Sequence, residues 1–102
     1  MAGAGRDDIL AALRRVIDPE IGINVVDLGL VYEAETGDGH VRVVMTMTTP
    51  ACPLGESIAE EARTSIRHHV RGVKSVAVEL VSEPPWQPSM MSSAARERLG
   101  RT

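Results

Sequence analysis

Residues 40–48, with the sequence HVRVVMTMT, decide the fold because their side chains alternate in polarity along the chain. Every second position from 41 to 47 is a valine or a methionine, whereas an arginine stands at position 42 and threonines at positions 46 and 48. A period of two predicts a β-strand with one face against helices and the other in solvent. The predicted buried face is Val41, Val43, Met45 and Met47, and the predicted solvent face is Arg42, Val44, Thr46 and Thr48.

The segments on either side predict two more strands. Residues 30–35 read as a strand, and the turn sequence TGDG at 36–39 joins them to residues 40–48 in an antiparallel hairpin. Residues 73–81 read as a third strand, which is reached through a helix. A strand, a helix and a strand in succession predict a right-handed crossover and therefore a mixed sheet.

The helix of this crossover is predicted over residues 53–70. Pro53 suits its first position, and Gly72 suits the left-handed conformation that commonly follows a helix. Its expected apolar stripe is Leu54, Ile58, Ala62, Ile66 and Val70.

The two ends of the chain predict one further helix each. The first opens at Asp7 and stops at Asp18, because a residue before proline avoids the α-helical region. The last is short, with Ser92 or Ser93 as N-cap.

The fold class is therefore α+β, a two-layer sandwich in the order helix, hairpin, helix, strand, helix. Residues 1–102 form one domain with a proline-rich tail from about residue 82. The expected apolar face of the first helix is Ile9, Leu10, Leu13, Val16 and Ile17.

Composition excludes several classes of function. The formal net charge is −3, no basic patch is present, and one Trp and one Tyr are the only aromatic side chains, so nucleic acid is not an expected partner. The first residues, MAGAGRDD, have no apolar signal region, and no apolar run is long enough to span a bilayer. A single cysteine forms no internal disulfide, which fits a cytoplasmic location.

Cys52 is the principal candidate for chemistry. It follows the second strand and stands at or just before the start of the central helix, where free N–H groups stabilise a thiolate. Pro50 and Pro53 flank it and stiffen the loop. A thiolate binds metal or acts as a nucleophile, whereas a structural cysteine is a small buried hydrophobe. The loop position favours the functional interpretation.

Five polar residues are candidates to line the same site. Asp18, Glu20 and Asp27 surround the first irregular loop, where carboxylates either orient a metal ligand or cap turns, and Asp18 is expected to cap. Thr49 offers a hydroxyl beside the Cys52 loop, although threonine is also an ordinary strand residue. Glu83 follows the third strand.

Trp86 lies in the proline-rich tail and has two interpretations. It is a docking point for a partner, since tryptophan is enriched at interface centres, or it fastens the tail to the chain's own sheet. The histidines do not complete a thiol enzyme. His68 stands sixteen residues after Cys52, roughly 24 Å along a helix, and is too distant to act as its base.

Three stretches, DPEIGINVVDLGLVY, MTMTTPACPLG and LVSEPPWQPSMMSSAARERLG, resemble the metal–sulfur cluster biosynthetic factor family, the SufT-like and PaaD-like proteins. The resemblance covers nearly the whole chain, and DPE, VDLGLV, TTPxCP and EPPW in this order are specific. It implies a fold of the iron–sulfur assembly kind and a role in maturing iron–sulfur proteins. It also implies that Cys52 is the reactive family cysteine and the metal ligand, and that Asp18, Glu20, Asp27, Thr49 and Glu83 line one site.

Two departures refine this expectation. The cysteine-bearing C-terminal extension of PaaD-like proteins is absent, which favours the SufT-like type, and position 55 is a glycine where related scaffolds have the second cysteine of a Cys-x-x-Cys pair. One thiolate does not hold a cluster alone, because a cluster needs four ligands. The missing ligands would come from a second chain in a homodimer or from an external thiol. Alternatively, Cys52 hands the cluster on without binding it stably.

The leading interpretation is an accessory or carrier protein, not an enzyme, that handles iron or an iron–sulfur cluster transiently through Cys52 without binding it stably. Its expected partners are the iron–sulfur assembly machinery and client apoproteins. The alternative is a metal-free adaptor that recruits clients through the EPPW tail, with Trp86, and through the first loop.

Overall fold

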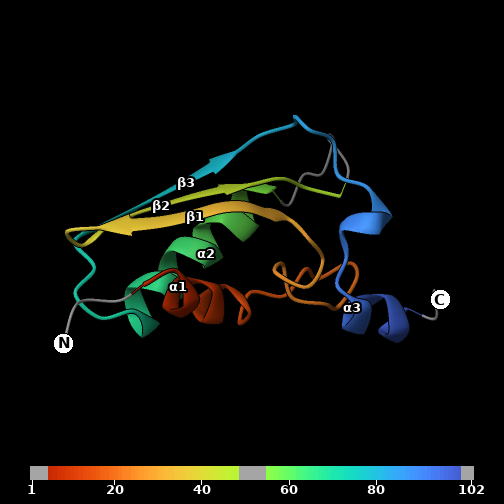
Figure 1. Cartoon of the computed structure of the whole chain (residues 1–102), viewed down its shortest axis with the longest axis horizontal. Helices are drawn as coiled ribbons and strands as arrows, with labels where there is room; N and C mark the ends of the chain where they lie inside the picture. Colours follow the sequence, from red (N-terminus) through yellow and green to blue (C-terminus); the bar gives the residue numbers. More distant parts are fainter. Residues whose placement is uncertain (1–4, 49–54, 100–102) are drawn as a thin grey trace.

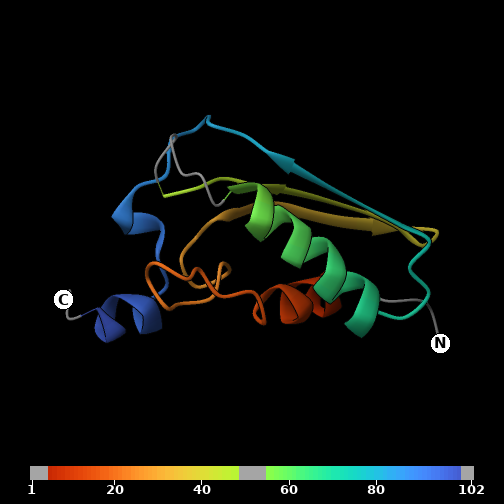
Figure 2. The ribbon, with the colours of Figure 1, turned by 180° about the vertical axis from the view of Figure 1, so that it is seen from behind.

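The computed structural model describes residues 5–48 and 55–99. A three-stranded sheet forms one layer, and two helices packed on one of its faces form the other (Figures 1 and 2). The tail runs back from the third strand to the irregular segment that precedes the first strand (Figure 1). The elements are α1 (Arg6–Leu13), β1 (Val31–Gly37), β2 (His40–Met45), α2 (Gly55–His69), β3 (Ser75–Leu80), the 3₁₀ helix η1 (Pro88–Met90) and α3 (Ser93–Arg98).

The sheet has the order β1-β2-β3 and is mixed, as the sequence predicts. β1 and β2 form the antiparallel hairpin, and β2 pairs with β3 in parallel from His40↔Ser75 to Met45↔Leu80. A parallel pair needs a crossover connection, and α2 supplies it. The α+β class and the order of the elements are therefore confirmed.

The core lies between the sheet and the two helices. Val43 and Met45 of β2 are completely buried, and Val41 nearly so, which confirms the predicted inward face. Ile58, Ala62, Ile66 and Val70 of the predicted helix stripe are also buried, whereas Leu54 lies outside the described residues. With almost no aromatic side chains available, this core is built from branched aliphatic residues, alanine and methionine.

The first helix is shorter than the sequence predicts. It ends at Leu13, and Ile17, expected on its buried face, is 44% exposed. The reason is a competing backbone pairing: residues 16–18 run antiparallel to 23–25, with an isolated bridge between Ile17 and Asn24. The Val25 amide donates to the Val16 carbonyl at 3.0 Å. Backbone groups that would otherwise extend the helix therefore form hydrogen bonds across the loop.

The outward face of β2 also differs from expectation. Thr46 is only 3% exposed, not in solvent, and its hydroxyl donates a hydrogen bond to the Val81 carbonyl at 2.7 Å. Val44, also expected on the solvent face, is only 7% exposed. The strand itself ends at Met45, three residues before the predicted end.

The turns follow the glycine pattern. β1 extends to Gly37, so only Asp38 and Gly39 form the hairpin turn, both with positive φ (52° and 84°). Gly72 has a φ of 70° beyond the end of α2, which confirms its predicted left-handed conformation. β3 is shorter than the predicted 73–81.

The tail confirms the last predicted helix. Ser92 is the N-cap of α3, and its side-chain oxygen accepts a hydrogen bond from the Ala95 amide at 3.1 Å. The Ser92 amide in turn donates to the carbonyl of Asp27 at 2.7 Å, which ties the tail to the first loop. Within the described part of the chain, no helix has both the length and the apolar character to cross a membrane.

Candidate functional site

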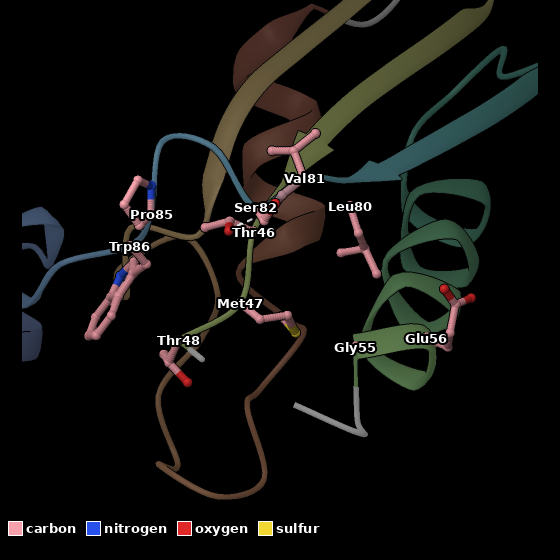
Figure 3. Close-up of a pocket in the computed structure, with 10 residues that line it drawn as sticks. All are labelled: Thr46, Met47, Thr48, Gly55, Glu56, Leu80, Val81, Ser82, Pro85 and Trp86. Atoms are coloured by element: carbon pink, nitrogen blue, oxygen red, sulfur yellow. Dashed lines mark hydrogen bonds between the residues drawn. The ribbon is translucent and has the colours of Figure 1, made fainter. Parts of the chain in front are cut away.

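A cavity of about 500 Å³ lies where the parallel strands β2 and β3 end (Figure 3). Its walls come from the segment after β2, the start of α2, the segment after β3 and the beginning of the tail. In open sheets of this kind, the carboxyl ends of parallel strands are a common place for ligands. The lining residues are Thr46, Met47, Thr48, Gly55, Glu56, Leu80, Val81, Ser82, Pro85 and Trp86.

One part of the wall is polar. Thr48 and Ser82 contribute hydroxyls, and Glu56 contributes a carboxylate from the first turn of α2 (Figure 3). The hydroxyl of Thr46 is already engaged with Val81, so it holds the segments after β2 and β3 together. The hydroxyls of Thr48 and Ser82 can donate hydrogen bonds to an anionic ligand such as a thiolate or a sulfide.

The rest of the wall is apolar, with the side chains of Met47, Leu80 and Trp86 around the opening (Figure 3). Gly55 keeps this region open, because a Cβ atom added there would lie 3.4 Å from Met47 Sδ and 3.4 Å from Leu80 Cδ1. A site that combines apolar walls with a few polar groups is typical of ligand binding.

Two predicted site residues, Cys52 and Thr49, lie outside the described residues. The six residues 49–54 join Thr48 to Gly55, and both of these flanking residues line the cavity. The candidate site is therefore the cavity at which the Cys52-bearing segment begins and ends.

The acidic residues of the first loop are used within that loop. Asp18 is 2% exposed, and its Oδ1 accepts hydrogen bonds from the amides of Glu20 (2.9 Å) and Ile21 (3.3 Å), so it caps a turn as predicted. Asp27 Oδ2 accepts from the Asn24 side chain at 2.9 Å. Neither Asp18 nor Asp27 lines the cavity.

The remaining candidates are dispersed. Trp86 donates from its indole nitrogen to the Leu28 carbonyl at 2.7 Å, so its ring is fastened to the first loop, not to the sheet. It separates the main cavity from a second one of about 400 Å³, which Glu20 also lines. Glu83 lines a different cavity, together with Arg42 and Tyr32. The structure thus brings Trp86 to the cavity and leaves the four carboxylates elsewhere.

Sequence reasoning missed several lining residues, including Met47, Gly55, Glu56 and Ser82. A usable signal was present, since these positions follow β2 or β3 or start α2, and the ends of parallel strands meet at one edge.

Among residues 5–48 and 55–99, no group of three or more histidine, aspartate or glutamate side chains is arranged to hold a metal ion.

Comparison with known proteins gives a consistent result. A family model described as iron–sulfur cluster assembly protein matches residues 6–80. The chain is 47% identical over 95 residues to the Fe-S protein maturation auxiliary factor of Porphyromonas gingivalis, covering 92% of this chain and 90% of that protein. It is 38% identical over 101 residues to the Fe-S protein maturation auxiliary factor YitW of Bacillus subtilis, covering 98% of each.

A solved structure supports the fold. The crystal structure of a domain of unknown function from Bacillus anthracis superimposes with a TM-score of 0.90 at 34% identity, covering 93% of this chain and 91% of that one. The match extends beyond the sheet and the two helices into the tail that carries Trp86, because it covers nearly the whole chain.

Proposed function

The chain belongs to the iron–sulfur cluster assembly protein family, and we propose that it is an accessory or carrier protein that handles iron or a cluster transiently through Cys52. The relatives named as auxiliary factors support the accessory role, which it would perform in the cytoplasm without being an enzyme. The cluster is cargo, passed from the assembly machinery to client apoproteins.

The cavity at the start of α2 is the observation that supports Cys52 as the working residue. Only two residues lie between Cys52 and Gly55, so three Cα–Cα steps of about 3.8 Å keep their Cα atoms within about 11 Å. Gly55 lines the cavity, and the Thr48 and Ser82 hydroxyls on its wall suit sulfide or thiolate. Thr49, next to Thr48, is proposed to add a third hydroxyl.

The proposed chemistry is ligand exchange on iron. A thiolate of the client replaces the Cys52 thiolate, and no electron is transferred. Because a cluster needs four ligands and this chain has one cysteine, the others come from the donor, the client or a second copy in a homodimer. An incomplete ligand set favours rapid transfer over stable storage.

The other predicted residues have supporting roles in this proposal. Trp86, half-buried at the edge of the cavity, would contact the partner that approaches it. Asp18 and Asp27 keep the first loop in the shape onto which the tail packs. Glu20 and Glu83 are exposed and would act on partners through their charge.

Anaerobic reconstitution of the wild type, Cys52→Ala and Cys52→Ser with iron and sulfide tests the proposal. The absorbance of the cluster, the iron content per chain and transfer to an apo-ferredoxin are measured, with urea unfolding as a check of folding. We expect cluster and transfer in the wild type and loss of both in Cys52→Ala, at unchanged stability.

Three results would contradict this expectation. Equal iron and transfer in Cys52→Ala would remove the role of Cys52, and unfolding of that variant would indicate a packing role. Absence of cluster in every protein, combined with client capture that Trp86→Ala abolishes, would establish the metal-free adaptor instead.

A further inference from the structure

β3 is an edge strand, and among the described residues no strand pairs with its outer side. Ser75 donates its N–H to the Gly39 carbonyl and Val81 donates to the Met45 carbonyl, so the odd-numbered positions bond toward β2. Because backbone groups alternate along a strand, those of Val76, Val78 and Leu80 point away from the sheet. No backbone hydrogen bond from another described residue reaches these three.

The two edges of the sheet are protected to different degrees. β1, on the opposite edge, carries a register irregularity between Val31 and Glu33, a device that discourages further pairing. β3 pairs with β2 without interruption over six residues and contains neither proline nor lysine. An edge of this kind is a template for another strand.

The helix-facing side of β3 is apolar and incompletely covered. Val78 and Leu80 are half-buried, although their partners in register on β2, Val43 and Met45, are completely buried. A strand added beside β3 would cover the exposed part of both side chains. Apolar residues at alternate positions of that strand would therefore be favoured.

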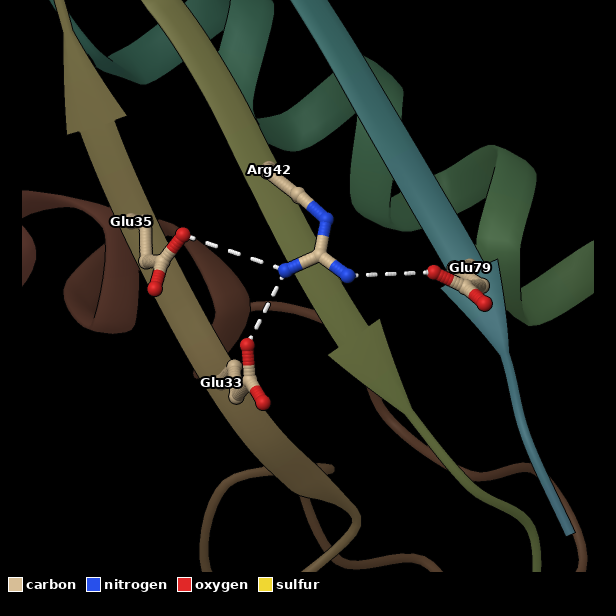
Figure 4. Close-up of polar contacts among 4 residues, drawn as sticks. All are labelled: Glu33, Glu35, Arg42 and Glu79. Atoms are coloured by element: carbon tan, nitrogen blue, oxygen red, sulfur yellow. Dashed lines mark hydrogen bonds and ion pairs between the residues drawn. The ribbon is translucent and has the colours of Figure 1, made fainter.

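On the open face of the sheet, β3 contributes Glu79, and β1 contributes Glu33 and Glu35. Arg42 Nη1 lies 3.0 Å from Glu33 and 3.8 Å from Glu35, and its Nη2 lies 3.3 Å from Glu79 (Figure 4). The hydrogen bond to Glu33, together with the charges of Glu33, Glu79 and Glu35, raises the pKa of Arg42 above its ordinary value. Three carboxylates share one guanidinium, so negative charge remains for basic side chains to balance.

We propose that the free edge of β3 binds an extended segment of a partner protein as a fourth strand. The segment alternates in character, with apolar side chains toward α2 and basic side chains toward Glu79. Main-chain hydrogen bonds supply affinity, and the two faces supply specificity. Leu80 and Val81 line the main cavity, so the bound segment leads to it. The inference deepens the proposed function. It rests on that function in one respect, that the partner is a client or an assembly protein.

A capped nine-residue peptide of alternating lysine and valine is the probe. Its binding to the ¹⁵N-labelled chain is followed by NMR shifts and by amide hydrogen exchange. We expect slower exchange of the Val76, Val78 and Leu80 amides. The variant Val78→Pro removes the central edge donor and leaves the β2–β3 hydrogen bonds in place, because an edge strand tolerates proline at such a position. Its affinity should fall about tenfold.

Matched controls isolate the backbone contribution. Val78→Ala keeps the N–H and should lose less affinity than Val78→Pro. Glu79→Gln should weaken binding and reduce its dependence on salt, since it removes one charge from the open side. The same peptide with a central proline should bind about tenfold more weakly than the parent.

Three outcomes would overturn the inference. They are undiminished binding to Val78→Pro, undiminished binding of the proline peptide, and protection of the edge amides that rises with chain concentration in the absence of peptide. The last would assign the edge to a second copy of the chain. Cys52→Ala should bind the peptide like the wild type, so failure of the cluster proposal and failure of this one are distinguishable.

Discussion

The two ends of the sheet are closed in different ways. At the hairpin end the backbone is tied tightly, since the Gly39 carbonyl accepts hydrogen bonds from the amides of Lys74 (2.6 Å) and Ser75 (3.3 Å). The side chains of His40 and Ser75 add a contact of 2.7 Å. At the other end the strands separate around the cavity, and the Thr46–Val81 hydrogen bond joins the segments that follow them.

In the proposed function, this difference would assign stability to one end of the sheet and binding to the other. The hairpin end holds the register of β2 against β1 and β3, and the backbone of Gly39 lies in close contact with that of Gly72. The cavity end is less densely built and is where the Cys52-bearing segment is attached. A rigid scaffold that presents binding residues on connecting segments is a common division of labour in proteins.

The largest expected effect is at the hairpin end. Gly39 has a φ of 84°, and a Cβ atom there would lie 2.7 Å from the Gly72 carbonyl oxygen. Gly39→Ala therefore combines a left-handed backbone with a clash against main chain, and should lower the free energy of unfolding by about 2–4 kcal/mol. Urea unfolding measures the loss.

The matched control for this change is Gly37→Ala, because Gly37 has an ordinary φ and a Cβ atom there would meet nothing within 4 Å. Its stability should stay within about 0.5 kcal/mol of the wild type. A Gly39→Ala variant as stable as Gly37→Ala would mean that the hairpin end is not tightly constrained.

A smaller effect is expected where the strands separate. Thr46→Val conserves shape, but it removes the hydroxyl that donates to the Val81 carbonyl. Loss of a buried hydrogen bond should cost about 1–2 kcal/mol in thermal or urea unfolding. Thr48→Val on the half-buried rim of the cavity makes the same chemical change and should have almost no effect. If both variants were equally stable, Thr46 would not be what joins the two segments.

The sequence predicts the hairpin end better than the cavity end, for a physical reason. Alternation in residues 40–48 and the glycines at 37, 39 and 72 are local signals, and the buried face of β2 and the turn positions follow from them. The burial of Thr46 and the early end of α1 depend on contacts with residues distant in the chain or across a loop. No periodicity in the sequence encodes such contacts.

The same limit applies to the candidate site. The expectation that Asp18 caps a turn is confirmed, because a short carboxylate accepts hydrogen bonds from backbone amides two or three residues further on. That Trp86 reaches the cavity, by way of a hydrogen bond to Leu28 fifty-eight residues earlier, depends on how the tail packs on the first loop. Residue type alone identified Trp86 as a candidate but not the surface on which it lies.

Apart from the control variants, the smallest expected change in stability is at the cavity itself. A Cβ atom at Gly55 would make ordinary contacts of 3.4 Å with Met47 and Leu80, and alanine favours a helix more than glycine does. Gly55→Ala should therefore change stability by less than about 1 kcal/mol. Its methyl group occupies space in the cavity, so the iron bound after reconstitution should fall, with the exposed Ser57→Ala as control.

The paired result for Gly55→Ala and Gly39→Ala tests the division between the two ends most directly. A stable Gly55→Ala variant that binds less iron, beside a destabilised Gly39→Ala variant that still binds iron while folded, would place binding and stability at opposite ends of one sheet. If Gly55→Ala were as destabilising as Gly39→Ala, the cavity end would be packed as tightly as the hairpin. In that case Gly55 would be a packing requirement and not a device that keeps the cavity open.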